Sequence, residues 1–220
     1  MMAAQGGGDW KSDYVQDGIL MWLDGEHNSV DGSHDPNLTV WVDQSGNGYD
    51  WNLDGNFVIG EKSVNVSGAG GGSLISGKAK PTSAFAEIVF RKTGSAVAYE
   101  FIYGTFHGVA TKPNTIYLQG TNICFTAKGQ GPETSLALAT SGDVVYYNSE
   151  LYRNGAIASN TEQGDYWRGD GNYLFLYGNG AYGFKADVYA FRLYNRVLTE
   201  AEILRNFAAD QKRFGIEVSA

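Results

Sequence analysis

The pattern of apolar and polar positions is clearest near the end of the chain, in residues 187–215. Between residues 188 and 194 almost every side chain is apolar or aromatic, and alternate positions of a strand point to opposite faces. One set comprises Tyr189, Phe191 and Leu193, and the other comprises Val188, Ala190, Arg192 and Tyr194. Because both sets are largely apolar, we expect a strand that is covered on both faces.

A helix is predicted directly after this strand. Thr199 is a good N-cap residue, and Glu202 stands where a capping box requires an acidic or amide side chain. Leu198 and Ile203 can close a hydrophobic staple across the cap, and Gly215 can end the helix. The apolar stripe expected from helical spacing consists of Ile203, Leu204, Phe207 and Ala208. The sequence therefore predicts one short amphipathic helix that packs on an apolar surface made earlier in the chain.

Upstream, short apolar or alternating runs recur between turn signals. The predicted strands are 18–24, 39–43, 51–59, 63–67, 85–91, 96–103, 115–119, 122–127, 135–139, 144–147 and 173–177. Asn154-Gly155 is the sharpest hairpin signal, because this pair adopts the positive φ values of a type I′ turn. Residues 68–72 are glycine-rich and are expected to form a loop; they lack the pattern of a phosphate-binding loop. Many short strands at close spacing favour an all-β sandwich or barrel.

Composition narrows the class further. A chain of 220 residues suits one large all-β domain, and 30 glycines with few prolines suit many tight turns. A formal net charge of -8 argues against binding a nucleic-acid backbone. The lone Cys124 excludes an internal disulfide and is expected to be a small buried hydrophobe. No apolar run reaches the length of a membrane span.

The leader, residues 1–16, is expected to be an N-terminal arm, with a single domain over residues 17–220. It contains three consecutive glycines, which are costly to order, and it shows no pattern of an export signal. Docking on a partner subunit would supply the missing contacts, which predicts a homo-oligomer or a component of an assembly. The alternative is an edge strand on the chain's own sheet, anchored by Trp10.

Three stretches together resemble the laminin-G-like branch of the concanavalin A-like lectin/glucanase superfamily. They are residues 17–25 with 41–50, the Leu-Tyr-Arg-Asn-Gly hairpin at 151–155, and residues 184–203 with the terminal strand and helix start. The stretch 82–143 matches only as strands. The resemblance implies a jelly-roll sandwich of two antiparallel sheets with one short C-terminal helix. Such domains often bind glycans or proteins, although a fold does not fix a function.

No catalytic residues are predicted. Hydrolase branches of this superfamily carry a strand motif of the type E-x-D-x-x-E, which this sequence lacks. Glu200 and Glu202 belong to the helix start, and Glu87 and Glu100 are lone acids in predicted strands, whereas glycosidases need two carboxyl groups across a cleft. The three histidines are scattered and have no cysteine partner, so a zinc site is not expected.

Calcium is the metal that the sequence best accommodates. Asp43, Asn47 and Asp50 lie close together in a glycine-rich turn, and hard cations are bound by several oxygens from loops. The resemblance also places a Ca²⁺ ion at the rim of some family members. The alternative, which we favour, is that Asp43, Ser45 and Asn47 satisfy backbone groups of the turn itself.

A ligand site is predicted in two late loops that combine aromatic and polar side chains. Its residues are Trp167, Asp170, Asn172, Asn179 and Tyr182. Sugar rings stack on aromatic faces, Asp and Asn bind hydroxyl groups, and loops on a rigid sandwich commonly carry sites. The alternative is that Trp167 and Tyr182 cover the ends of the core.

The predicted function is a non-enzymatic binding module for a glycan or a surface protein, with no nucleic-acid partner. The resemblance suggests work outside the cell, yet no export signal is seen, and bacteriophage proteins leave by lysis without one. We therefore expect a virion or extracellular location, as a phage fibre, tail or capsid decoration that serves host attachment. The alternatives are a purely structural virion or assembly protein and a glycoside hydrolase.

Overall fold

The computed structural model describes residues 9–74, 82–94, 100–104, 116–120, 122–125, 134–137, 143–149, 152–157, 169–170, 173–174 and 184–217. Its elements are a 3₁₀ helix η1 (Trp10–Asp13), strands β1 (Ile19–Asp24), β2 (Val40–Trp41), β3 (Trp51–Ile59), β4 (Val64–Leu74), β5 (Thr82–Ser83), β6 (Phe85–Lys92), β7 (Glu100–Gly104), β8 (Ile116–Gln119), β9 (Asn122–Phe125), β10 (Thr134–Ala137), β11 (Val144–Asn148), β12 (Tyr152–Arg153), β13 (Ala156–Ile157), β14 (Gly169–Asp170), β15 (Tyr173–Leu174) and β16 (Lys185–Tyr194), and one helix α1 (Glu200–Phe214). Within these ranges no helix is long and apolar enough to cross a membrane.

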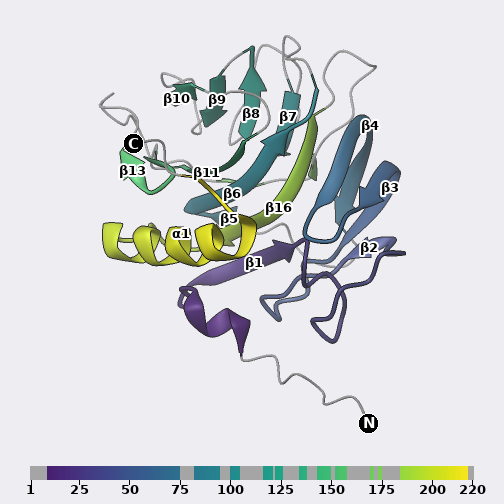
Figure 1. The fold of residues 1–220 in the computed structure, drawn as a ribbon, viewed down its shortest axis with the longest axis horizontal. Coiled ribbons are helices and arrows are strands. Elements are labelled where there is room, and N and C mark those ends of the chain that lie inside the picture. The colour runs from purple at the N-terminus through teal and green to yellow at the C-terminus, as the bar shows by residue number, and fades with distance from the viewer. Residues whose placement is uncertain are drawn as a thin grey trace.

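The strands form an antiparallel sandwich with α1 on its outside (Figure 1). The main path of pairing runs β10-β9-β8-β7-β15-β4-β16-β6-β11-β12-β13, with β1 on β16 and with β3 and β2 beyond β4. Strand β4 joins the two layers, since its first residues pair with β16 and its last with β15. This arrangement confirms the predicted all-β fold with one C-terminal helix.

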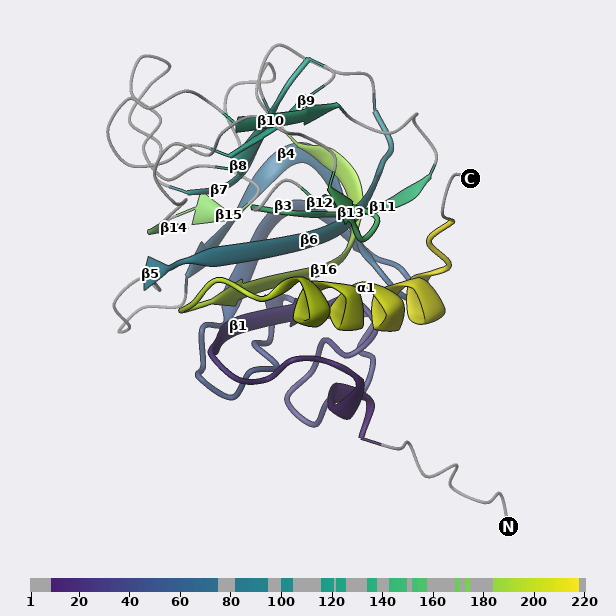
Figure 2. The ribbon, with the colours of Figure 1, turned by 90° about the vertical axis from the view of Figure 1, so that its left-hand side faces the viewer.

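The main core lies between the layers. Buried side chains of β7, β8 and β9, among them Ile102, Leu118 and Ile123, belong to one cluster with Ile88 of β6 and Phe191 of β16. A second cluster lies on the other side of β6 and β16, where α1 covers the sheet (Figure 2). Both faces of β16 are therefore buried, as the sequence predicted.

The glycine-rich stretch expected to be a loop is part of a strand. Residues 64–74 form β4 without interruption, and Gly70, Gly71 and Gly72 pair with β3. The prediction was wrong because glycine has a low intrinsic preference for strands. Here pairing of Gly70, Gly71 and Gly72 with β3, and of Gly72 with β15 as well, overrides that preference. Strand β4 curves as it passes from one layer to the other (Figure 2), and glycine suits such a bend because it has no Cβ atom to crowd the neighbouring strands.

A β-bulge changes the facing of side chains along β16. Its register against β6 shifts between Val188 and Ala190. In consequence Val188 joins Phe191 in the main core, whereas Tyr189 lies with Ala190 under the helix. The predicted alternation, which put Tyr189 with Phe191 and Val188 with Ala190, was wrong at these two positions, because a bulge inserts an extra residue and reverses the facing on its other side.

Helix α1 begins as predicted. The Thr199 side chain accepts a hydrogen bond from the Glu202 backbone N–H, and the Glu202 carboxylate accepts one from the Thr199 backbone N–H at 2.9 Å, which is a capping box. Arg196 also binds Glu202, and together with the cap these contacts lower the pKa of the Glu202 carboxyl to about 2. At the other end Gly215 adopts a left-handed conformation with φ of 69° and caps the helix.

The buried face of α1 differs from the predicted stripe. Ile203 and Phe207 are buried as expected, but Leu204 is 44% exposed and Ala208 is exposed. The buried positions in their place include Asn206 and Asp210, both 0% exposed. A stripe drawn from apolar residues alone was wrong because these two polar side chains find buried partners on the sheet, which are described in the next section.

The Asn154-Gly155 hairpin is confirmed, and it packs directly against the helix. Asn154 and Gly155 have φ values of 50° and 73° and join β12 to β13. A Cβ atom built on Gly155 would lie 2.5 Å from Cδ1 of Phe207. The turn therefore requires glycine for two reasons, which are the positive φ and the close approach of α1.

We predict that Gly155→Ala destabilises the protein more than Gly120→Ala. Both glycines have positive φ, but a Cβ atom on Gly120 would meet nothing within 4 Å. Gly120→Ala should cost about 1–2 kcal/mol from backbone strain alone. Gly155→Ala should cost about 1–3 kcal/mol more, because Phe207 must shift. The measurement is urea unfolding of both variants, and equal losses would contradict the contact with Phe207.

Candidate functional site

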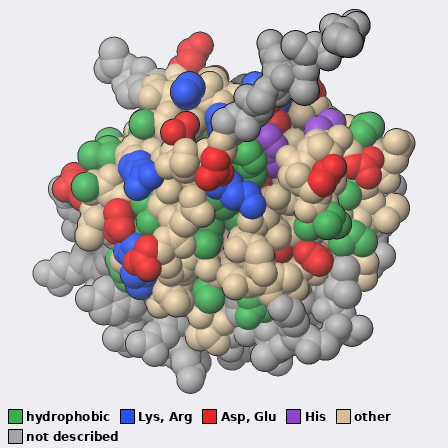
Figure 3. Space-filling model, turned by 90° about the horizontal axis from the view of Figure 1, so that it is seen from below, with side chains coloured by type: hydrophobic (Ala, Val, Ile, Leu, Met, Phe, Trp, Pro, Cys, Tyr) green, Lys and Arg blue, Asp and Glu red, His purple; other side chains and the backbone are tan. Residues whose placement is uncertain are grey.

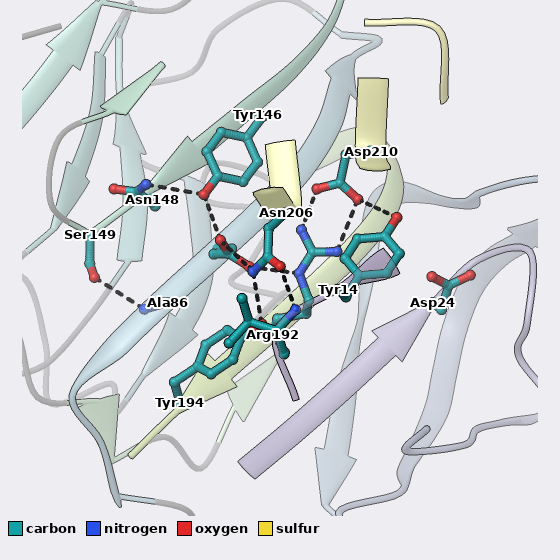
Figure 4. A network of polar contacts seen from close by, with 12 residues as sticks. Tyr14, Asp24, Ala86, Tyr146, Asn148, Ser149, Arg192, Tyr194, Asn206 and Asp210 are labelled. Atoms are coloured by element: carbon teal, nitrogen blue, oxygen red, sulfur yellow. Dashed lines mark hydrogen bonds and ion pairs between the residues drawn. The ribbon is translucent and has the colours of Figure 1, made fainter. Parts of the chain in front are cut away.

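A concentration of charged and polar side chains lies in the interior, between the sheet and α1 (Figure 4). At its centre is Arg192 of β16, which is 0% exposed. Its Nε donates to Oε2 of Glu87 on β6 at 2.7 Å, and its Nη1 donates to Oδ1 of Asp210 on α1 at 2.9 Å. Its Nη2 donates to the other carboxylate oxygen of Asp210, so that pair is bidentate. One guanidinium thus joins two strands of the chain's core to its helix.

Glu87 has further donors around it. Tyr146 donates its hydroxyl to Oε1 at 2.6 Å, and Asn206 Nδ2 lies 2.9 Å from Oε2. Burial raises the pKa of the Glu87 carboxyl, and the positive charge of Arg192 opposes that rise. Burial also raises the pKa values of the Tyr146 and Tyr194 phenols, and the charge of Glu87 adds to the effect. The carboxylate has the hydrogen bonds that a buried charge needs.

A second ion pair continues the network toward the N-terminal segment. Arg213 near the end of α1 binds both carboxylate oxygens of Asp24, at 3.0 and 2.8 Å, and donates to the Tyr14 hydroxyl at 3.1 Å. Tyr14 donates in turn to Oδ1 of Asp210 at 2.9 Å, which connects the two ion pairs. Burial raises the pKa of the Tyr14 phenol, and the charge of Asp210 adds to this.

The described part of the expected N-terminal arm packs on its own chain. The Trp10 ring stacks on His27 with centroids 4.0 Å apart, and the Arg213 guanidinium lies 4.7 Å from the Trp10 ring centroid. The Val15 backbone N–H donates to Asn206 Oδ1 at 2.8 Å. Residues 10–13 form a 3₁₀ helix, not the edge strand of the alternative prediction. Docking on a partner stays a prediction for residues 1–8, which lie outside the described residues.

The geometry of this network indicates that it stabilises the fold and does not bind a ligand. Glu87, Arg192, Asn206 and Asp210 are all 0% exposed, so a substrate cannot reach their polar atoms. A signal in the sequence could have identified these four residues. Glu87 and Arg192 are charged residues within apolar strands, and Asn206 and Asp210 stand four residues apart beside Ile203 and Phe207. Charged side chains at such positions are buried only when they are paired. The presence of one such residue therefore predicts a buried partner of opposite charge.

The predicted calcium residues have another role in the structure. Asp43 Oδ1 accepts hydrogen bonds from the backbone N–H groups of Trp22 at 2.8 Å and Ser45 at 2.9 Å. Its Oδ2 accepts from Ser45 Oγ at 2.8 Å and from the Tyr49 N–H at 2.9 Å. Both carboxylate oxygens are therefore engaged by donors of the protein, and Asp43 ties the turn to β1.

Asn47 and Asp50 also act within the turn. Asn47 Nδ2 donates to the carbonyl oxygens of Ile19 and Leu20 at 3.1 and 3.0 Å, and Asp50 Oδ1 accepts from the Asp43 N–H at 2.8 Å. The geometry agrees with the alternative reading, in which these side chains satisfy backbone groups. Across the described ranges, no group of three or more His, Cys, Asp or Glu side chains is arranged to hold a metal ion.

The predicted ligand residues are mostly beyond what the structure describes. Trp167, Asn172, Asn179 and Tyr182 lie outside the described residues. Asp170 lies in β14, where its backbone pairs with Thr82 of β5. Strand β15 follows two residues later and pairs with both β4 and β7. The backbone on either side of residues 171–172 is thus anchored in sheets.

No protein-family model matches the chain, and no curated protein matches it. Similar folds occur among solved structures. A mutant Trypanosoma rangeli sialidase with trans-sialidase activity gives a TM-score of 0.61 at 14% identity, over 92% of this chain and 34% of that one. This chain therefore spans about a third of the length of the sialidases that it resembles.

Two further structures are similar over binding domains. The receptor binding domain of botulinum neurotoxin C/D mosaic serotype gives a TM-score of 0.58 at 12% identity, over 88% of this chain and 52% of that one. Domain 4 of the extracellular arabinanase AbnA from Geobacillus stearothermophilus, in complex with arabinotriose, gives 0.57 at 14% identity, over 86% of this chain and 98% of that one. At such identities the likeness concerns the fold. The fold of this chain is that of a concanavalin A-like, laminin-G-like β-sandwich.

We predict that Asp210→Asn lowers the free energy of unfolding by about 3–5 kcal/mol, because it leaves the buried Arg192 charge without one of its two carboxylates. The matched control is Asp17→Asn, which removes a carboxylate that is 85% exposed and pairs with Arg196. The control should cost less than about 1 kcal/mol. Denaturant unfolding measures both variants. A loss at Asp210 as small as that at Asp17 would show that the network does not hold α1 to the sheet.

Proposed function

We propose that this chain is a non-enzymatic carbohydrate-binding module. The observation that carries the proposal is the similarity to domain 4 of the arabinanase, a structure bound to arabinotriose, across 98% of that domain. The match covers nearly the whole of that domain and 86% of this chain. The sialidases and the toxin domain extend the same fold to proteins that act on or recognise receptors and sugars, as their names state. Fold likeness supports the class of function and leaves the ligand open.

The site proposed for the sugar is the set of late-loop residues Trp167, Asp170, Asn172, Asn179 and Tyr182. Their chemistry supports this, because aromatic rings cover sugar faces while amides and carboxylates bind hydroxyls. The strand pairings of β14 and β15 support it too, since they anchor the backbone on either side of residues 171–172. Binding loops held by rigid strands lose little freedom when a ligand binds.

The absence of catalysis is part of the proposal. Glu87 and Glu100, the two acids that the sequence places in strands, are 0% and 1% exposed. Glu87 forms an ion pair with Arg192, and Glu100 forms one with Lys92. Glu202 belongs to the helix cap. A hydrolytic pair needs two accessible carboxyl groups that face one cleft. The positions of these three acids favour binding over hydrolysis.

We predict that Trp167→Ala and Tyr182→Ala each weaken glycan binding by about tenfold or more, which corresponds to about 1.4 kcal/mol. The matched control is Trp10→Ala, since Trp10 is partly exposed but its ring contacts His27 and Arg213. A glycan microarray would identify a ligand, and calorimetry with and without Ca²⁺ would measure each variant. Calcium should not change the affinity, because protein donors engage both Asp43 carboxylate oxygens.

Two results would contradict this proposal in different ways. Binding that is lost in Trp10→Ala but kept in Trp167→Ala and Tyr182→Ala would move the site away from the late loops. No binding to any glycan on the array would contradict the carbohydrate-binding function itself. Melting temperatures of all three variants separate lost binding from lost folding.

We propose, as a separate point, that the module works outside the cell, on a phage virion or as an extracellular protein. The support comes from the sequence, in which the resemblance to laminin-G-like domains suggests a role at exposed surfaces. We expect mass spectrometry to find the chain in purified particles or culture medium. Its confinement to the cytoplasm of intact cells would contradict the proposal. Particles that assemble without it but fail to attach would favour host binding over a purely structural role.

A further inference from the structure

The sign of the surface charge bears on which sugars this fold can accept. Among the described residues, the exposed acidic side chains are Asp9, Asp13, Asp17, Asp31, Glu61, Asp143, Glu200 and Glu217. The exposed basic side chains in the same ranges are Arg153, Arg205 and Lys212. The excess of acid holds for the whole sequence as well, whose formal net charge is -8. An approaching anion therefore meets a negative potential.

The arginines of the described residues are largely bound to the chain's own groups. The pairs with carboxylates are Arg91 with Asp187, Arg192 with Glu87 and Asp210, Arg196 with Asp17 and Glu202, and Arg213 with Asp24 and Glu26. Arg205 donates to the carbonyl oxygens of Ser12 and Asp13, at 2.7 and 3.1 Å. On the face shown in Figure 3, basic side chains mostly lie beside acidic ones. Guanidinium groups recognise a carboxylate with two parallel hydrogen bonds. In the four ion-paired arginines these donors already bind carboxylates of the same chain.

From this distribution of charge we propose that the ligand of this module is an uncharged saccharide, and that glycans bearing sialic acid, uronic acid or sulfate are discriminated against. The inference rests on the proposed carbohydrate-binding function and makes it more specific. Neutral sugars offer hydroxyl groups, which donate well to carboxylates and amides and meet no penalty in a negative field. An anionic sugar would meet repulsion, and among the described residues the ion-paired arginines would have to give up a carboxylate to bind it.

The test compares neutral and anionic glycans on the full chain. A microarray that holds neutral oligosaccharides, arabinotriose among them, together with their sialylated, uronic and sulfated counterparts identifies the class. Calorimetry then measures a matched pair, the best neutral ligand and the same sugar with one acidic group, at 20 mM and at 500 mM salt. We expect the acidic member to bind at least about tenfold more weakly at low salt, and the difference to narrow at high salt because salt screens exposed charges.

A charge variant separates repulsion by the surface from poor fit in the site. The triple variant Asp13→Lys, Glu61→Lys and Glu217→Lys changes three exposed residues and brings the formal net charge from -8 to about -2. It should leave the affinity for the neutral sugar within about twofold and strengthen binding of the acidic one at low salt. An unchanged difference between the two sugars would overturn surface charge as the cause.

The remaining outcomes are distinct. If the acidic sugar binds as tightly as the neutral one or more tightly, with an affinity that falls as salt rises, the inference is overturned while the carbohydrate-binding function stands. If no glycan of either class binds, the proposed function fails and the inference fails with it.

Discussion

The structure depends on one buried guanidinium. Arg192 lies in β16, which pairs with β6 along one edge and with β1 and β4 along the other, and its three nitrogens donate to carboxylates of β6 and α1. A charge at 0% exposure costs several kcal/mol to desolvate, so it persists because Glu87 and Asp210 are fixed within hydrogen-bond distance. Each partner is placed by a different element, and the pairing therefore specifies how helix and sheet sit together. An apolar helix face alone could slide or rotate on the sheet; a bidentate ion pair cannot.

The same network holds the segment before β1 against helix α1. Asn206 of α1 accepts from the Val15 backbone N–H, and Tyr14 reaches Asp210 and Arg213. The segment before β1 and the helix α1 after β16 are thereby held together next to β1 (Figure 1). The buried polar side chains of Glu87, Arg192 and Asp210 are bound to one another in this network, which leaves them unavailable to a substrate. The ligand site that we propose lies in loops, which a rigid sandwich can vary at little cost to stability.

A β-bulge and several glycines adapt the regular strands to the elements packed against them. The bulge at Val188–Ala190 brings Tyr189 under the helix, the glycines of β4 let one strand serve two layers, and Gly155 lets the hairpin approach Phe207. Each adapts a regular strand pattern to a neighbour distant in sequence. The bulge and the glycine-containing strand could not be recognised from periodicity, because their cause lies in the element packed against them, whereas the Asn154-Gly155 turn was predicted from its residue types.

The sequence by itself determined the class of fold, the capped helix from Thr199 to Gly215, the Asn154-Gly155 hairpin and most strand positions, because caps, turns and alternation are local effects. Only the tertiary structure decided that Asn206 and Asp210 face inward in place of Leu204 and Ala208, and that residues 68–72 form a strand. It also decided that Asp43, which was expected to satisfy backbone groups of its own turn, accepts a hydrogen bond from the Trp22 N–H of β1 as well. The physical reason is the same in each case. A polar or glycine position is stabilised by its partner, and the partner comes from a part of the chain that local pattern does not reach.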